Sequence, residues 1–206
     1  MLTHVLVPPF TAQLAREMSL SRPGTVLPSG RSTSSSCSPP RISRCPTRAA
    51  GSCNLATAAE HRIIRENELL LLDLWGKLRQ PGAVYADITW IGFTGTAIPA
   101  TMTKAFAAIC AARDAAVTAV ETAARAGREI RGFEADKAAR KVLIDAGYED
   151  AILHRTGHSL GENVHGNGAH LDDYETHDER RLMPGSGFTI EPGLYFKDFG
   201  VRTEIN

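Results

Sequence analysis

Residues 188–195 read FTIEPGLY, a short apolar run that a carboxylate interrupts at Glu191. The Pro-Gly pair that follows restricts the backbone just beyond this residue. A charged side chain in such surroundings must be paired or bound to a metal ion, because burying a lone ion is very unfavourable. Glu191 is therefore the strongest single candidate for a functional side chain.

Two further runs near the C-terminus carry side chains of the same kind. The run HRTGH begins at His154, and the run GVRTE ends at Glu204. Glycines surround the histidines, and glycine permits close approach of the backbone to a ligand or metal ion. We expect His158 to be a metal ligand and His154 and His165 to face a substrate, although histidines in a glycine-rich turn can also bond to backbone alone.

Other histidines lie in a strongly polar stretch, where we expect a solvated loop. This stretch holds His170 and His177 together with Asp172, Asp173, Glu175 and Asp178.

Two aspartates lie upstream in β-rich surroundings. Residues 69–75 and 83–90 are rich in leucine, β-branched and aromatic residues, which predicts two strands. Residues 76–82 between them contain glycine, proline and glutamine, so we expect a hairpin with a long loop. Asp73 and Asp87 would then point into one cleft.

Two helices are predicted downstream of the hairpin. Residues 103–126 are rich in alanine and end before Gly127, and residues 133–146 end before Gly147; glycine is the usual residue just past a helix end. Short strands are expected around Leu153, Val164, 188–190 and 201–205. Strands followed by helices and then strands predict an α+β domain, with the helices on the outer face of a curved antiparallel sheet.

In these residues the chain resembles the pita-bread metallopeptidases, which include aminopeptidase P, prolidase and methionine aminopeptidase. The resemblance runs from about Glu60 to the C-terminus and implies the pita-bread fold; residues 188–193 and 200–202 look most like the Xaa-Pro branch. That family uses two Asp, one His and two Glu as metal ligands, in this order along the chain. By resemblance the ligands here are Asp73, Asp87, His158, Glu191 and Glu204.

The resemblance implies two divalent metal ions, most commonly manganese or cobalt, with Asp87 and Glu204 bridging them. Four carboxylates and one imidazole form a hard, oxygen-rich set, which also suits zinc or iron. Two ions about 3.5–4 Å apart can share one hydroxide. The sequence therefore predicts an exopeptidase that hydrolyses Xaa-Pro bonds with a metal-activated hydroxide.

The remaining catalytic roles fall on side chains around the predicted ligands. His165 or His154 would stabilise the oxyanion by hydrogen bonding. Glu191 would relay a proton to the leaving amine, and Arg202 would contact the substrate.

Several features depart from the family pattern. Asp73 and Asp87 are further apart than is usual, the family's upstream substrate-binding histidine is replaced by Ala56, and His61 is too close to the first aspartate to replace it. The family's N-terminal domain and the continuation beyond Glu204 are also lacking. We therefore expect a C-terminally truncated, incomplete catalytic domain over residues 59–206, with weak turnover.

Residues 1–58 are predicted to be a low-complexity, disordered extension. Residues 1–55 are rich in serine, proline and arginine, contain Glu17 as their one acidic residue, and resemble nothing in the family. Such a composition supports no core, so we expect few contacts with the rest of the chain. Three of the four cysteines lie in this region at spacings of eight residues, which match no zinc pattern; they are Cys37, Cys45 and Cys53.

The overall composition limits the classes of molecule that the chain is expected to bind. Lys and Arg together equal Asp and Glu in number, giving zero formal charge, so nothing favours nucleic acid. Apolar runs are far shorter than the roughly 20 residues of a membrane span. We expect a small peptide substrate, a homodimer and a cytoplasmic location. Two rivals are an inactive pseudo-peptidase or fragment acting as a binding module and a creatinase-like C–N hydrolase; the complete ligand set disfavours both.

Overall fold

The structure is a computed structural model that describes residues 4–6, 35–37, 41–43 and 64–206. Cys45, Cys53, Ala56 and His61 lie outside the described residues, as does most of the predicted disordered extension. Within the described part, no helix is both long enough and apolar enough to span a membrane.

An antiparallel hairpin forms the centre of the main sheet. Its strands are β4 (Leu69–Leu78) and β5 (Ala86–Phe93). The predicted hairpin is confirmed, but β4 continues through Gly76, so the connection is 79–85 rather than 76–82. The turn includes Gly82 at φ +74°, a backbone conformation that glycine adopts without strain.

Three short strands extend this sheet on both sides of the hairpin. β1 (His4–Leu6) pairs with β5, and β2 (Ser35–Cys37) and β3 (Arg41–Ser43) pair with β4, all antiparallel. These three triplets contact the hairpin, and the expectation that residues 1–55 as a whole make few contacts stays a prediction. A short strand needs only backbone hydrogen bonds to an open sheet edge, which a polar composition does not prevent.

Two helices follow the hairpin, as predicted. α2 (Ala100–Arg125) begins directly after Pro99, and α3 (Gly132–Asp145) follows a short connection. Gly127 and Gly147 lie just past the two helix ends at φ +62° and +81°. Both glycines therefore act as the expected helix stops.

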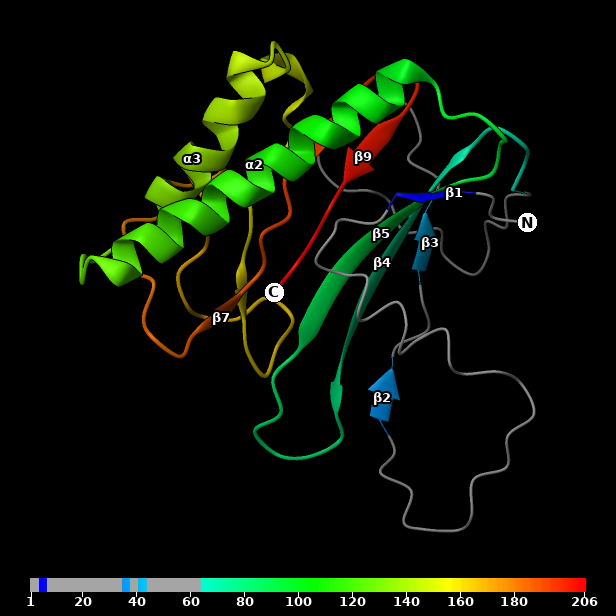
Figure 1. Ribbon diagram of the computed structural model, residues 1–206. Helices are drawn as coiled ribbons and strands as arrows, with labels where there is room; N and C mark the ends of the chain where they lie inside the picture. Colours follow the sequence, from blue (N-terminus) through cyan, green and yellow to red (C-terminus); the bar gives the residue numbers. More distant parts are fainter. Residues whose placement is uncertain (1–3, 7–34, 38–40, 44–63) are drawn as a thin grey trace, which may run out of the picture.

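The two helices pack together on one side of the molecule (Figure 1). The buried residues of α2 include Ile109 and several alanines, and those of α3 include Ala135 and Ala139. Small side chains let the helix backbones approach closely. α2 also contacts β8 (Gly193–Tyr195) and β9 (Gly200–Arg202), so these strands lie against the helical layer.

Short elements connect the helices to the last strands. They are the 3₁₀ turn η2 (Glu149–Ala151) and two antiparallel pairs, β6 (Ser159–Leu160) with β7 (Gly187–Phe188) and β8 with β9. The strands predicted around Leu153 and Val164 were wrong. Leu153 follows η2, and Val164 lies in a tight loop closed by a hydrogen bond from the Gly166 N–H to the Ser159 carbonyl (2.7 Å).

One hydrophobic core joins the helices to the hairpin. It includes Ile91 of β5, Ile109 of α2, Leu194 of β8 and Val201 of β9, none of them more than 1% exposed. The α+β class is thus confirmed. The curvature of the sheet stays a prediction.

Candidate metal centre

The face of the hairpin that meets the core changes from apolar to acidic along its length. Residues directly opposite each other in an antiparallel pair point to the same face, as do residues two apart on one strand. The pairs on this face are, in order, Leu71 with Ile91, Asp73 with Thr89, and Trp75 with Asp87. The register therefore places Asp73 and Asp87 on the same inner face.

A second antiparallel pairing carries His158 and Glu191. The pairing of β6 with β7 continues in register, because the Thr189 N–H donates to the His158 carbonyl (2.8 Å) and the Glu191 N–H to the Thr156 carbonyl (2.6 Å). His158 thus lies opposite Thr189, and Glu191 lies opposite Thr156. These side chains share one face.

The segment after β9 brings Glu204 to the hairpin. The next residue, Ile205, exchanges two backbone hydrogen bonds with Ile190 (2.9 and 3.2 Å), which fixes this segment beside Glu191. Glu204 is 3% exposed, and its Oε2 accepts a hydrogen bond from Thr89 Oγ1 (2.6 Å). Glu204 therefore links the last described segment to β5.

Three buried side chains converge where these segments meet. One donor atom each from Asp87, His158 and Glu204 lies within 4.8 Å of the other two. Glu191 adjoins them, with its Oε1 3.3 Å from His158 Nε2, which in turn is 3.6 Å from Asp87 Oδ2. The structure thus brings four of the five expected ligands into direct proximity.

The fifth expected ligand, Asp73, is connected through Arg202. The Arg202 guanidinium donates from one terminal nitrogen to Asp73 Oδ2 (2.5 Å), and its Nε lies 3.9 Å from Glu191 Oε2. When ionised, Asp73, Asp87, Glu191 and Glu204 carry four negative charges, of which this guanidinium offsets one. The cluster is therefore strongly anionic.

The protonation of the cluster reflects this excess of negative charge. Burial and the nearby Glu191 raise the pKa of Glu204 well above its usual value. Burial also raises the pKa of Asp73, against the opposing effect of Arg202. Although burial disfavours the charged imidazole, the neighbouring Asp87 and Glu191 raise the pKa of His158. Burial is thus the main cause of the two carboxylate shifts, and the neighbouring carboxylates of the cluster add to them.

The residues present fit a divalent cation. Among the described residues, Asp87 Oδ1 is the one buried side-chain oxygen or nitrogen without a hydrogen-bond partner, and such groups are rare in folded proteins. His158 Nδ1 lies 3.1 Å from the Ser159 carbonyl and donates to it, which leaves Nε2, the nitrogen nearest the carboxylates, to bind a cation once it has lost its proton. Imidazole ligands of metal ions are usually oriented in this way.

The other two histidines occupy different positions beside the cluster. His165 is exposed, and its ring lies edge-on to that of His158 with the centroids 4.2 Å apart. His154 is engaged at both nitrogens, with Nδ1 2.7 Å from the Arg155 carbonyl and Nε2 2.7 Å from the Tyr195 hydroxyl. Burial lowers the pKa of both histidines. His154 therefore holds Tyr195, while His165 is free to face solvent or a substrate.

Sequence reasoning missed the two threonines that hydrogen-bond to the glutamates. Thr89 donates to Glu204, and Thr189 donates to Glu191 (2.9 Å). The only signal was their spacing, because Thr89 lies two residues after Asp87 and Thr189 two residues before Glu191. Side chains at that spacing on a strand share a face.

The solvated loop expected around His170 was wrong in part. Asp172 is 0% and Asp178 6% exposed, because their carboxylates accept backbone N–H groups of the same loop. His170 is half-buried, and its Nδ1 accepts a hydrogen bond from the Ser159 N–H (2.9 Å). His177 is exposed, as expected, and stacks on Phe133.

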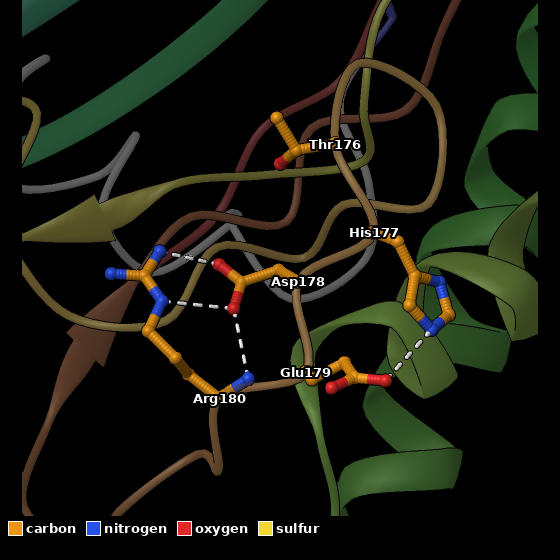
Figure 2. A pocket seen from close by; sticks show the side chains of 5 residues that line it. All are labelled: Thr176, His177, Asp178, Glu179 and Arg180. Atoms are coloured by element: carbon orange, nitrogen blue, oxygen red, sulfur yellow. Dashed lines mark hydrogen bonds and ion pairs between the residues drawn. The ribbon is translucent and has the colours of Figure 1, made fainter.

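A surface hollow of about 380 Å³ lies at residues 176–180 of this loop. Figure 2 shows that its charged side chains face one another, with Arg180 bonded to Asp178 and His177 close to Glu179 (3.6 Å). None of its lining residues belongs to the anionic cluster. We therefore assign the hollow to the structure of the loop and not to the candidate metal centre.

Asp178 should make the contribution of this loop to the free energy of unfolding depend on pH. Burial alone would raise its pKa, but hydrogen bonds from Arg180 and from the His170 N–H lower the pKa of Asp178 from 3.8 to about 2. A group whose pKa is lower in the folded than in the unfolded state stabilises the protein at pH values above its unfolded pKa. This stabilisation is lost as the pH falls through the folded-state pKa. Asp178→Asn is expected to reduce the free energy of unfolding by ~2 kcal/mol at pH 7 and by progressively less from about pH 5 to pH 2. Urea unfolding across this range checks it; a constant difference between the two proteins would contradict the assignment.

Comparison with known proteins gives a family match over most of the chain. The model of metallopeptidase family M24 matches residues 30–206. The chain is similar to an Xaa-Pro dipeptidase of Lactobacillus helveticus, with 39% identity over 45% of this chain and 23% of the relative. It is 32% identical to a probable dipeptidase PepE of Mycobacterium bovis, over 69% of this chain and 35% of the relative.

A solved prolidase from Pyrococcus horikoshii has a TM-score of 0.64 at 26% identity, with 80% of this chain and 43% of that one covered. The chain thus spans about a quarter to a third of the length of the two curated relatives. The family match begins at residue 30, so part of residues 1–55, expected to resemble nothing in the family, falls within it.

Proposed function

Because the chain belongs to metallopeptidase family M24, we propose that it is a metal-dependent exopeptidase that hydrolyses Xaa-Pro peptide bonds. The observation that carries the proposal is the convergence of Asp87, His158 and Glu204 within 4.8 Å, with an unpartnered buried oxygen on Asp87. The substrate class is supported by the similarity to an Xaa-Pro dipeptidase and a prolidase.

The proposed site holds two divalent ions, manganese or cobalt. Their ligands would be Asp73, Asp87, His158, Glu191 and Glu204. When bound, such ions polarise the scissile carbonyl and lower the pKa of a nucleophilic water. In this assignment a cation would replace Arg202 as the partner of the Asp73 carboxylate.

The chain's own side chains would then position the substrate and move a proton. His165 is exposed beside His158, and its lowered pKa keeps the imidazole neutral near pH 7, so a ring N–H can donate to the substrate carbonyl. Glu191 Oε1 is occupied by Thr189, so Oε2 would accept a proton and pass it to the leaving amine. Arg202 borders the cluster, with its Nε 3.9 Å from Glu191 Oε2, and would contact the substrate. A homodimer and a cytoplasmic location stay predictions.

Metal-dependent hydrolysis tests the proposal directly. The full chain, stripped with a chelator, is assayed with an Xaa-Pro dipeptide and an Xaa-Pro-Yaa tripeptide, with and without added manganese or cobalt. Hydrolysis is expected to require added metal, because neither the four carboxylates nor His158 can polarise the scissile carbonyl as a metal ion does.

Matched Xaa-Ala peptides serve as the substrate control, and Asp87→Asn as the protein control for metal-dependent contamination. Cleavage of Xaa-Ala at the same rate as Xaa-Pro would overturn the assigned substrate class. Metal binding without any peptide hydrolysis would favour the binding-module rival. An unchanged rate after complete metal removal would refute the metallopeptidase assignment.

A further inference from the structure

Two buried threonine hydroxyls lie between nitrogen donors and the glutamates of the candidate metal centre. Thr89 is 4% exposed and Thr189 is 0% exposed, so neither hydroxyl can be satisfied by bulk water. Each must therefore find its hydrogen-bond partners within the protein. In each case a nitrogen donor and a glutamate oxygen both lie within hydrogen-bond distance of the hydroxyl.

Thr189 alters the strand pairing at the site itself. Opposite residues of a regular hydrogen-bonded antiparallel pair exchange two backbone hydrogen bonds. The Thr189 N–H donates to the His158 carbonyl (2.8 Å), but the His158 N–H donates to the Thr189 hydroxyl (2.9 Å). The same hydroxyl lies 2.9 Å from Glu191 Oε1. A side-chain oxygen thus joins the backbone of His158 to the carboxylate of Glu191.

Thr89 makes the corresponding connection on β5. Its hydroxyl accepts a hydrogen bond from Arg202 Nε (3.1 Å) and lies 2.6 Å from Glu204 Oε2. Thr89 also lies directly opposite Asp73, which receives the terminal nitrogen of the same guanidinium. The hydroxyl is therefore held between the ion pair and the glutamate.

These contacts determine the direction of both hydroxyl groups. A backbone N–H and an arginine Nε–H can only donate, so each threonine oxygen accepts from them. A hydroxyl has a single hydrogen, which is then left for the carboxylate. A carboxylate has about four acceptor directions, so one fixed hydrogen bond orients the group and leaves other lone pairs for a cation.

We propose that Thr89 and Thr189 are positioning residues that orient Glu204 and Glu191 for divalent-metal binding through hydroxyls of fixed direction. The inference rests on the proposed function, because it needs the cluster to bind a metal ion. It adds two residues, neither of them a ligand, whose loss weakens metal binding without removing any ligand.

Metal affinity of hydroxyl-free variants tests this inference. Manganese binding to the metal-free full chain is measured by calorimetry for wild type, Thr89→Val and Thr189→Val. Each valine variant is expected to bind about 10- to 100-fold more weakly, as is usual when a group that orients a metal ligand is removed. Thr89→Ser and Thr189→Ser keep the hydroxyl and are expected to restore most of the affinity.

Thr176→Val is the matched control, because the Thr176 hydroxyl also donates to a carboxylate, Asp172 Oδ2 (2.9 Å), but at a distance from the cluster. Its manganese affinity is expected to equal that of wild type. Thermal unfolding of each metal-free variant shows whether weaker binding comes from a misoriented glutamate or from an unfolded protein. If a valine variant does not fold, the serine variant at the same position is compared with wild type instead.

The outcomes distinguish the two proposals. Valine variants that fold and bind manganese as tightly as wild type would overturn the positioning role alone. Serine variants as weak as the valine variants would also overturn it, since the role is assigned to the hydroxyl. A wild-type chain that binds no manganese would instead overturn the proposed function on which this inference rests.

Discussion

Replacing Glu204 with glutamine is expected to weaken divalent-metal binding strongly while making the metal-free protein more stable. Glu204 is 3% exposed and lies within 4.8 Å of donor atoms of Asp87 and His158. Loss of this proposed ligand should weaken manganese binding by about 10³-fold, equivalent to several kcal/mol. Calorimetry of the variant beside wild type measures this change.

The gain in stability has a separate physical cause. Two like charges about 5 Å apart repel by a few kcal/mol at an effective dielectric constant near 20, and burial adds to the unfavourable energy. The side chain introduced by Glu204→Gln carries no charge and can still accept the hydrogen bond from Thr89. We expect the free energy of unfolding of the metal-free protein to rise by roughly 1–3 kcal/mol at pH 7.

The pH dependence of this gain follows from the raised pKa of Glu204, which burial and the neighbouring Glu191 cause. A raised folded-state pKa gives stability that is present below the unfolded value of 4.5 and is lost as pH increases towards the folded value. Glu204→Gln should therefore be most stabilising near neutral pH and nearly neutral below pH 4.5.

Glu121→Gln is the matched control, since Glu121 is exposed and pairs with Arg125 on the surface of α2. Neither metal affinity nor stability should change measurably, because exposed ion pairs contribute little. A Glu204 variant that retains wild-type manganese affinity would refute the assignment of this residue as a ligand.

The carboxylates of the cluster were noticed in the sequence because they conflict with their local surroundings, and the resemblance to the family supplied the complete set of expected ligands. Asp87 and Glu204 lie in β-rich runs, and Glu191 interrupts an apolar strand, so each needed a partner in the fold. The hairpin and both helices were predicted from residue type and from Gly127 and Gly147 for the same local reasons. These features depend on short stretches of chain, which sequence patterns describe well.

The roles of the threonines could not be predicted, because they depend on contacts between distant segments. Thr89 meets Arg202, 113 residues away, and Glu204, 115 residues away. The register of β4 on β5 and the path of the last segment must both be known before these contacts appear. Neither is contained in local composition.

The burial of Asp172 was also missed, although it had a local signal. Its Oδ1 accepts hydrogen bonds from the N–H groups of Tyr174 and Glu175, two and three residues later. Aspartates commonly close turns on their own backbone in this way. A carboxylate satisfied by its own loop can be buried without a metal ion, which distinguishes Asp172 from Asp87.

Gly157→Ala is the substitution expected to disturb both stability and the candidate metal centre most directly. Gly157 lies between Thr156 and His158, where the pairing with residues 189–191 is tight. A Cβ at this position would lie 2.0 Å from the Thr189 carbonyl oxygen and 2.8 Å from the Thr189 carbonyl carbon. Both are backbone atoms, so no side-chain rotation can relieve the overlap, and the two chains must separate.

That separation would act on the same hydrogen bonds that hold the site. The His158 N–H donates to the Thr189 hydroxyl, and the Glu191 N–H donates to the Thr156 carbonyl. We expect a loss of about 3 kcal/mol in the free energy of unfolding, as for severe overpacking in a core. Manganese affinity should fall by about 100-fold or more, since His158 and Glu191 would no longer keep their relative positions.

Gly161→Ala provides the control, because a Cβ at Gly161 would make only ordinary contact, 3.6 Å from the Gly166 Cα. Chemical unfolding and manganese calorimetry of both alanine variants, each metal-free at the start, separate the close approach at Gly157 from a general effect of replacing loop glycines. If Gly157→Ala is as stable as Gly161→Ala and binds manganese equally well, the pairing of residues 156–158 with 189–191 is not what positions His158 and Glu191. Loss of stability and manganese affinity in Gly157→Ala alone would instead show that the space beside the Thr189 carbonyl oxygen, which only glycine leaves open, is needed for the geometry of the centre.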